Sequence, residues 1–181
     1  LAANNILKPQ DGKPVVSPTQ DMVMGSYYLT IHREGAKGEG SSFATPEEAV
    51  IAYQTGEISL QAMVNVRFTK EINGVTKSRI IKTTPGRIIF NEAIPQDLGF
   101  VDRTQPDSEF LLEIDFLVGK KQLGKIVDYC YRRKGESATS AMLDEIKRLG
   151  FHYSTLGAVT ISVSDIVIPE EKAKLIATAE E

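Results

Sequence analysis

The sequence contains one cysteine and two histidines among 181 residues. Cys130 therefore has no partner for an intrachain disulfide, and multi-cysteine or histidine-rich metal sites are excluded. So little cysteine suits a reducing cytosol. No stretch reaches the roughly 18 consecutive apolar residues that a membrane-spanning helix needs, and no basic-then-apolar signal opens the chain. These absences predict a soluble, cytoplasmic protein without a membrane partner.

Neither positive nor negative charge is in large excess. The 21 Lys and Arg residues against 24 Asp and Glu residues give a formal net charge of −3. Such a balance predicts neither nucleic-acid nor membrane binding, so any nucleic-acid contact has to come from a local patch. The 41% of hydrophobic residues suffice for the core of one domain or two small ones. The chain starts at Leu1 rather than Met, which suggests a piece of something longer.

Proline and glycine punctuate the first third of the chain. Three prolines make 8–18 an extended segment that braces its neighbours. Thr19 is expected to cap a helix over 20–30, and closely spaced glycines make 35–40 a loop without a phosphate-binding motif.

Capping and alternation signals continue through the middle of the chain. Thr45-Pro46-Glu47-Glu48 has the pattern of a capping box and predicts a helix that ends before Gly56. Alternation over 60–68 predicts a half-buried strand, and Asn73-Gly74 predicts a hairpin turn into a returning strand over 75–82. Thr83-Thr84-Pro85-Gly86 then starts a short helix.

The second half of the chain begins with an acidic, irregular stretch. We expect Gln96–Leu117 to be a solvated excursion that ends in a strand near 110–117. Apolar spacing then predicts a helix over 119–134, stopped by Gly135, and a second over 138–149, capped by Gly150-Phe151. The two helices would form a helical hairpin.

The last part of the chain predicts one strand and one helix. Residues 159–168 are β-branched and alternating, which favours a closing strand that ends at Pro169. The final twelve residues, rich in Glu, Lys and Ala, start another helix.

The side chains that could take part in catalysis or binding have ordinary interpretations. His32 and His152 lie near the ends of elements, and no catalytic triad pattern includes them. Cys130 lies on an apolar helix face, where a thiol acts as a small hydrophobic group. One basic cluster decorates the polar side of the 119–134 helix and either contacts phosphates or an acidic partner or is simply solvated. Its members are Lys120, Lys121, Lys125, Arg132, Arg133 and Lys134.

Eight short motifs occur in an order that resembles the beta-prime subunits of bacterial DNA-directed RNA polymerase, and the resemblance spans nearly all of the chain. The motifs are Asn4-Asn5-Ile6-Leu7, the turn at 11–14, Ser17-Pro18-Thr19-Gln20-Asp21, Gly25-Ser26-Tyr27-Tyr28-Leu29-Thr30, Lys37-Gly38-Glu39-Gly40, Thr83-Thr84-Pro85-Gly86-Arg87, Gly119-Lys120-Lys121 and Asp165-Ile166-Val167-Ile168-Pro169.

The predicted elements make an α+β fold, with short strands and a hairpin, a helical hairpin and a closing strand, and the resemblance implies that it is a fragment of a larger multidomain subunit. It assigns 1–95 to the pore region and 119–181 to the helical hairpin, closing strand and start of the funnel or rim helix, with 96–118 as the acidic excursion between them. The pore and funnel line the secondary channel through which nucleotides reach the active centre. Gln20 and Asp21 would face that centre, and 173–181 would begin the rim helices where secondary-channel factors dock.

Catalysis by the parent nucleotidyltransferase would depend on residues outside this chain. The three aspartates that hold the catalytic magnesium lie upstream in this family, so the fragment alone should be inactive and hold no metal. The implied partners are the rest of beta-prime, the beta, alpha and omega subunits, DNA, RNA and nucleoside triphosphates. Ser164 replaces an acid common in the family. Ser137 and Arg148 stand where the alarmone pocket of some polymerases has a lysine and a tyrosine, which argues against such a pocket here.

Two other classes of function remain compatible with the residues alone. One is a free-standing module that binds single-stranded nucleic acid through Lys120, Lys121 and Lys125, although no repeated aromatic and basic pattern offers bases a stacking surface. The other is a structural scaffold domain.

Overall fold

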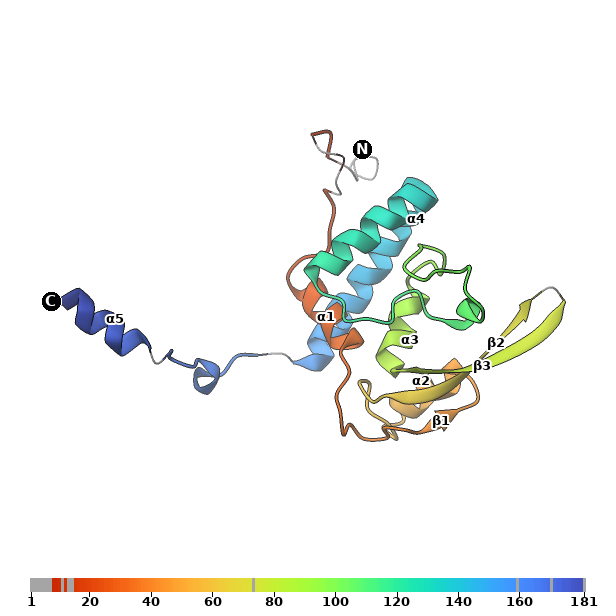
Figure 1. The fold of residues 1–181 in the computed structure, drawn as a ribbon, viewed down its shortest axis with the longest axis horizontal. Helices are drawn as coiled ribbons and strands as arrows, with labels where there is room; N and C mark the ends of the chain where they lie inside the picture. Colours follow the sequence, from red (N-terminus) through yellow and green to blue (C-terminus); the bar gives the residue numbers. More distant parts are fainter. Residues whose placement is uncertain are drawn as a thin grey trace.

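The computed structural model describes residues 8–10, 12, 15–72, 74–158, 160–169 and 171–180. Helices packed on one another form most of the body, a small sheet lies at one side of them, and the chain after the longest helix leads away from this body (Figure 1). In chain order the elements are α1 (Asp21–Thr30), β1 (Ser42–Phe43), α2 (Pro46–Gln54), β2 (Val64–Ile72), β3 (Val75–Thr83), α3 (Pro85–Glu92), the 3-10 helix η2 (Ser108–Phe110), α4 (Lys120–Gly157), the 3-10 helix η3 (Val163–Asp165) and α5 (Glu171–Glu180). The predicted α+β class is confirmed.

The sheet has the strand order β1-β2-β3. β1 runs parallel to β2, and β2 pairs with β3 as an antiparallel hairpin whose last pair is Ile72 with Val75. The predicted hairpin is confirmed, although Asn73 of its turn lies outside the described residues. β2 begins at Val64, four residues later than the start predicted at Leu60. β1 was not predicted, because two residues are too few to show alternation.

Both predicted threonine-proline helix starts are confirmed. The hydroxyl of Thr45 accepts a hydrogen bond from the amide of Glu48 at 3.2 Å, and that of Thr84 accepts one from the amide of Arg87 at 3.2 Å. The carboxylate of Glu48 accepts from the amide of Ala44 at 2.9 Å, one residue before the cap. Local side-chain chemistry thus fixes the starts of α2 and α3.

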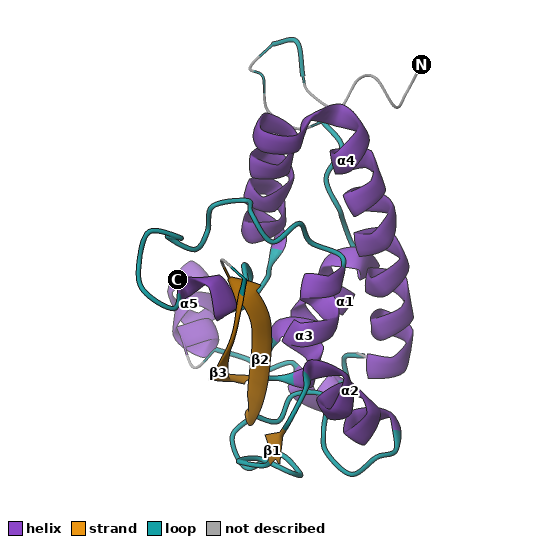
Figure 2. Ribbon diagram, turned by 90° about the vertical axis from the view of Figure 1, so that its right-hand side faces the viewer, coloured by secondary structure: helices purple, strands orange, loops and turns teal. Residues whose placement is uncertain are grey.

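α4 is a helical hairpin with a sharp break. Gly135 has φ 78° and ψ −171°, which separates two helical arms that lie side by side in Figure 2. The predicted stop at Gly135 is confirmed, but the predicted cap at Gly150-Phe151 is wrong, because the second arm continues to Gly157. Gly150 instead provides space for α1: a Cβ atom there would lie 2.7 Å from the Cα of Met22.

The acidic excursion is solvated only in part: residues 104–107 are exposed as predicted, but other residues are buried. Leu98, Phe110 and Ile114 are buried in it, and no strand forms near 110–117, where η2 and extended chain occur instead. The side chain of Asn91 replaces a neighbouring strand: its amide donates to the carbonyl of Ile114 at 2.8 Å, and its oxygen accepts from the amide of Ile114 at 2.9 Å. These bonds satisfy backbone groups that burial would otherwise leave unpaired.

A fully buried carboxylate explains part of the acidity of the excursion. Glu113, with 0% side-chain exposure, accepts hydrogen bonds from the backbone amides of Gly99 and Phe100 and from the guanidinium of Arg103 at 2.9 Å. Arg103 also donates to the carbonyl of Leu111 at 3.0 Å. Hydrogen bonds and an ion pair to this buried carboxylate therefore hold the excursion together.

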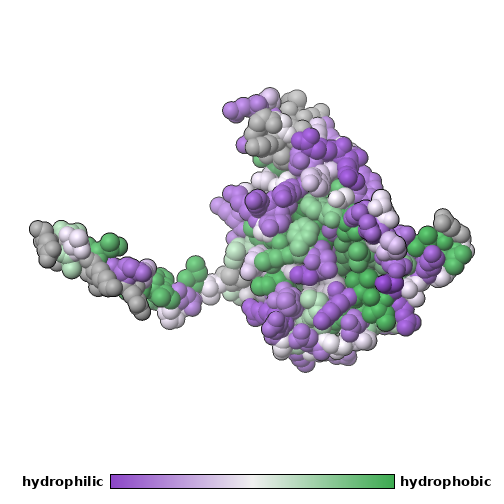
Figure 3. Space-filling model, in the orientation of Figure 1, coloured by the Kyte–Doolittle hydropathy of each residue, from purple (hydrophilic) through white to green (hydrophobic). Residues whose placement is uncertain are grey.

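The predicted closing strand is wrong. The described residues 160–169 form no strand, and η3 is fixed there by a capping box between Ser162 and Asp165. Val163 and Val167 are 87% and 84% exposed, and this segment and α5 show hydrophobic atoms away from the body in Figure 3. The predicted final helix is confirmed as α5. Among the described helices, none combines the length and apolarity needed to cross a membrane.

The core consists of two hydrophobic clusters. The larger lies among α1, α3 and both arms of α4, and it includes Leu29, Phe90 and Ile146. The smaller lies between α2 and β2, with Ala49 and Val66 among its members. The larger cluster holds α1, the helix whose start carries the candidate site.

Candidate functional site

Gln20 stands at the start of α1 in an unusual backbone conformation. It is the N-cap residue, with φ 49° and ψ −122°, and its side chain makes no capping hydrogen bond. Its carbonyl accepts from the amides of Val23 and Met24 at 3.0 and 3.1 Å. A positive φ in a residue other than glycine costs on the order of 1–3 kcal/mol and occurs preferentially at functional sites. The exposed side chain is thus left free for another contact.

Two details of the predicted site need correction. Thr19 does not cap α1 with its side chain, and its carbonyl instead accepts from the amide of Met22 at 3.1 Å. Gln20 lies just before the first helical turn rather than within it. Asp21 is confirmed as an exposed first-turn acid, where the helix dipole favours it. Of the predicted brace at 8–18, Asp11, Lys13 and Pro14 lie outside the described residues, while Pro18, two residues before Gln20, is buried.

The far end of α1 is anchored by residues from two other segments, Val118 and Arg87. The hydroxyl of Thr30 accepts from the amide of Val118 at 2.9 Å and donates to the carbonyl of Ser26 at 2.8 Å. Arg87 donates to the carbonyl of Thr30 at 3.0 Å and forms an ion pair with Asp115 at 2.9 Å. Such anchoring holds the helix, and with it Gln20, in a fixed position.

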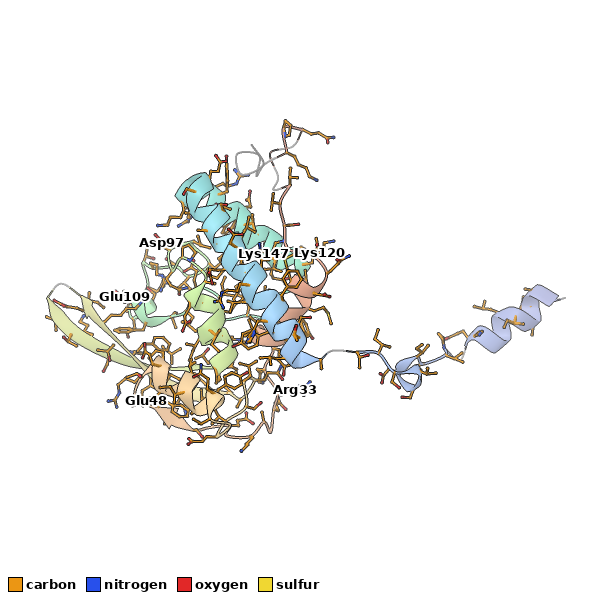
Figure 4. The ribbon with its side chains drawn as sticks, turned by 180° about the vertical axis from the view of Figure 1, so that it is seen from behind. Arg33, Glu48, Asp97, Glu109, Lys120 and Lys147 are labelled. Atoms are coloured by element: carbon orange, nitrogen blue, oxygen red, sulfur yellow. The ribbon has the colours of Figure 1, made fainter. Side chains whose placement is uncertain are left out.

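Three free lysines lie at the start of α4. Lys120 and Lys121 occupy its first turn and Lys125 the next, and all three are exposed. None of them forms a hydrogen bond or ion pair within the described part of the chain. Lys120 lies near α1 in Figure 4, but the structure shows no contact between these lysines and Gln20 or Asp21. Cations in a first turn oppose the helix dipole, so local helix stability does not explain them.

The other half of the predicted basic cluster has partners. Arg132 pairs with Asp128 one turn earlier at 2.9 Å, and Lys134 pairs with Asp97. Arg133 donates weakly to the carbonyl of Asp97 at 3.3 Å. The candidate contact surface is therefore the lysine patch, defined as Lys120, Lys121 and Lys125.

Burial distinguishes Cys130 from the two histidines. Cys130 is fully buried, and burial raises the pKa of its thiol, which disfavours the reactive thiolate. His32 is exposed. His152 is also exposed and meets the ring of Tyr153 edge-on, with ring centroids 4.9 Å apart.

Sequence reasoning missed a cleft of about 420 Å³ among α2, α3 and α4. Burial raises the pKa of Tyr153 to about 12, with smaller contributions from Tyr53 and Glu92. Burial, followed by the nearby Glu47, raises the pKa of Glu92, and Arg148 opposes that shift. No local pattern connects these residues, which come from separate elements.

Metal ligation has no candidate in the part of the chain that the structure describes. Within it, no three His, Cys, Asp or Glu side chains gather closely enough to hold an ion. The described residues thus do not fit the carboxylate set that magnesium prefers.

Comparison with known proteins connects this geometry to a family. The family model described as RNA polymerase Rpb1, domain 3, matches residues 5–166. The chain is 62% identical over 176 residues to DNA-directed RNA polymerase subunit beta′ of Clostridium novyi (strain NT), which covers 97% of this chain and 15% of that protein.

Two further relatives give the same result over the full chain. The beta′ subunit of Thermoanaerobacter sp. (strain X514) is 63% identical over 181 residues, 100% of this chain and 15% of that protein. That of Acetivibrio thermocellus (strain ATCC 27405) is 63% identical over 181 residues, 100% of this chain and 16% of that protein. The chain thus spans about 15% of the length of these relatives.

Proposed function

The chain belongs to the family described as RNA polymerase Rpb1, domain 3, and we propose that it works as part of the beta-prime subunit of a bacterial DNA-directed RNA polymerase. In this role it lines the secondary channel near the active centre and supports DNA-templated RNA synthesis. The similarity to beta′ subunits at 62–63% identity supports this proposal over a free-standing nucleic-acid module or a scaffold domain.

The conformation of Gln20 is the one observation that supports the proposed location near the active centre. A strained cap residue with an unused amide side chain stands at the start of a helix that is firmly anchored at its other end. Backbone N–H groups at a helix N-terminus favour anions, and an incoming nucleoside triphosphate is one. Gln20 then orients the nucleotide by a neutral hydrogen bond, and Asp21 lies beside it.

The lysine patch contributes a second, weaker contact. Lys120 and Lys121 lie where the helix dipole disfavours cations, and an anionic partner would offset that cost. We assign the patch to backbone phosphates or to another part of the polymerase rather than to specific bases, because lysine ammonium groups are point charges without the geometry for base reading.

The remaining assignments follow from the proposed subunit. Residues 1–95 form the pore region, 96–118 the excursion, and 119–181 the helical hairpin and the start of the rim helix where secondary-channel factors dock. The beta, alpha and omega subunits, the rest of beta-prime, DNA and RNA are the partners, in the cytoplasm. Magnesium is held by residues outside this chain, and the chain alone does not polymerise nucleotides.

The test is single-nucleotide addition by complete polymerase that carries Gln20→Ala. Loss of one neutral hydrogen bond, worth about 0.5–1.5 kcal/mol, should weaken nucleotide use by about two- to twelvefold at low substrate, with assembly intact. An unchanged rate curve in an assembled enzyme would contradict a role in nucleotide binding.

Gln20→Gly is the matched control for the backbone. Glycine accepts the positive φ without strain but also lacks the amide side chain. Equal defects in Gln20→Ala and Gln20→Gly indicate that the side chain matters. Full activity in Gln20→Gly alone would mean that only the backbone conformation is needed.

A further inference from the structure

The cleft of about 420 Å³ among α2, α3 and the second arm of α4 has no part in the proposed contacts of Gln20 and the lysine patch. These three helices lie close together in Figure 2. The volume falls within the range of about 300–1,000 Å³ that is typical of ligand pockets. Aliphatic side chains, among them Val50, Ile89 and Leu149, form part of the wall, and polar side chains form the rest. Such a cleft suits a group with an apolar stem and a polar head.

Tyr153 brings a hydroxyl without a hydrogen-bond partner to this cleft. The residue is only 7% exposed, and it lines the cleft from the second arm of α4. Glu92 and Arg148, which also line the cleft, both influence its pKa, so the hydroxyl lies on the cleft side of the ring. Within the described residues this hydroxyl forms no hydrogen bond. Because buried polar groups are nearly always paired, the hydroxyl indicates a partner that enters the cleft from outside.

The charged side chains of the cleft leave one carboxylate unpaired. Glu92, Glu145, Arg148 and the imidazole of His152 line it. Arg148 pairs with Glu145 at 2.9 Å, whereas Glu92 has no hydrogen bond or ion pair among the described residues. Burial, followed by the nearby Glu47, raises the pKa of Glu92, and Arg148 opposes that shift. The negative charge of Glu92 is therefore poorly compensated, and a cation in the cleft would compensate it.

We propose that the cleft receives the side chain of one lysine or arginine from a part of the polymerase outside this chain. The cationic head pairs with the carboxylate of Glu92 and donates a hydrogen bond to the hydroxyl oxygen of Tyr153. The methylene stem packs on the aliphatic wall, as the stems of lysine and arginine commonly do. One side chain thus satisfies both unpaired groups and fills the apolar part of the cleft.

The charge of the cleft argues against other occupants. A phosphate or another anion would lie beside Glu92 and Glu145 and be repelled. A polyamine carries several positive charges, whereas among the described residues that line the cleft Glu92 is the one unpaired acid. A protein side chain is favoured because the chain spans about 15% of the length of its relatives, so most of the subunit lies outside it.

The inference rests on the proposed function, because the basic residue comes from the polymerase, but it does not depend on the nucleotide contact of Gln20. The test of Gln20 measures nucleotide addition, whereas the test of the cleft identifies a neighbouring protein segment. The two can therefore fail separately.

The first experiment places the photo-crosslinking residue p-benzoylphenylalanine at Gln54, an exposed position that lines the cleft, in complete polymerase. We expect a cross-link to a polymerase segment that contains a lysine or arginine. Adding Glu92→Lys should lower the yield of this cross-link at least about fivefold, because two cations then face each other. A lysine suits the C-terminal end of α3, so the fold should be preserved.

Glu34→Lys is the matched control, because it makes the same change of charge at an exposed position outside the cleft. It should leave the cross-link yield unchanged. Equal yields with and without Glu92→Lys, or equal losses in Glu92→Lys and Glu34→Lys, overturn the proposal. Cross-links to nucleic acid alone, or no cross-link at all, also overturn it.

The second experiment exchanges the two charges of the pair. The basic residue identified by cross-linking is replaced by glutamate in the polymerase that carries Glu92→Lys. If the two side chains form an ion pair, the exchange restores their attraction, and the cross-link yield should return to within about twofold of its original value. A yield that stays at the level of Glu92→Lys alone overturns the proposal.

Discussion

Gly25 of α1 and Gly150 of α4 meet at the level of the backbone: a Cβ atom built on Gly25 would lie 1.9 Å from the carbonyl oxygen of Gly150. No side chain separates the two helices at this crossing. Gly157, two turns further along α4, makes a less close approach, because a Cβ atom there would lie 3.1 Å from the ring of Tyr28. The position of α1, and hence of Gln20 at its start, depends on these glycines.

Gly150→Ala should destabilise the fold by about 1–3 kcal/mol or more, because the added methyl group meets the backbone of Met22 and the helices must move apart. Urea unfolding of the chain measures the change as a lower midpoint. Gly124→Ala is the control: a Cβ atom there has nothing within 4 Å, so this change should stabilise α4 by about 0.5–1 kcal/mol. Equal midpoints for Gly150→Ala and wild type would argue against the close crossing.

Arg103→Met should cost about 3–5 kcal/mol, because it leaves the buried carboxylate of Glu113 without its counter-charge. Arg132→Met, which removes an exposed partner of Asp128, should cost at most about 0.5 kcal/mol. Urea unfolding distinguishes the two. Adding Glu113→Gln to Arg103→Met should recover part of the loss, and no recovery would show that Arg103 acts through its backbone contacts alone.

Alkaline pH should destabilise the fold partly through Tyr153. Burial raises the pKa of Tyr153 to about 12 in the folded chain, above its usual value of 10.0. Between these two pH values Tyr153 loses its proton in the unfolded state but keeps it in the folded state. The free energy of unfolding therefore falls as pH rises, whereas below pH 10 the titration of Tyr153 does not change it. Tyr153→Phe removes this titration and should show a smaller fall between pH 10 and 12. The fall should not vanish, because burial also raises the pKa of Tyr53. An identical fall in Tyr153→Phe and wild type would contradict the assignment.

Local signals predicted the features that local chemistry decides. Thr45 and Thr84 cap their helices, and Gly135 breaks α4, because each effect needs only neighbouring residues. Gly150 has the local pattern of a helix end, yet contact with α1 explains its presence within a continuous helix. The burial of Glu113 likewise depends on Arg103, ten residues away, and on tertiary packing.

The same distinction applies to the candidate site and to the end of the chain. Sequence reasoning selected Gln20 but assigned the N-cap of α1 to Thr19, since no local sequence pattern reveals a positive φ at Gln20. Residues 159–168 have the alternation of a strand, but alternation cannot supply a neighbouring strand to pair with. The described part of that segment has no such neighbour.

Charge reversal of the lysine patch should change chain stability and polymerase function in opposite directions. Lys120→Glu and Lys121→Glu place acids in the first turn of α4, where each should add about 0.3–1 kcal/mol of helix stability through the dipole. With Lys125→Glu included, the complete polymerase should lose transcription or assembly severalfold, because its anionic partner would be repelled. Urea unfolding of the chain and a transcription assay of the polymerase measure the two effects. Lys147→Glu, at an exposed position on the second arm, should leave transcription unchanged. If the triple variant gains stability and transcribes like wild type, the patch is a solvated helix face, since a binding surface cannot lose its charge without a functional defect.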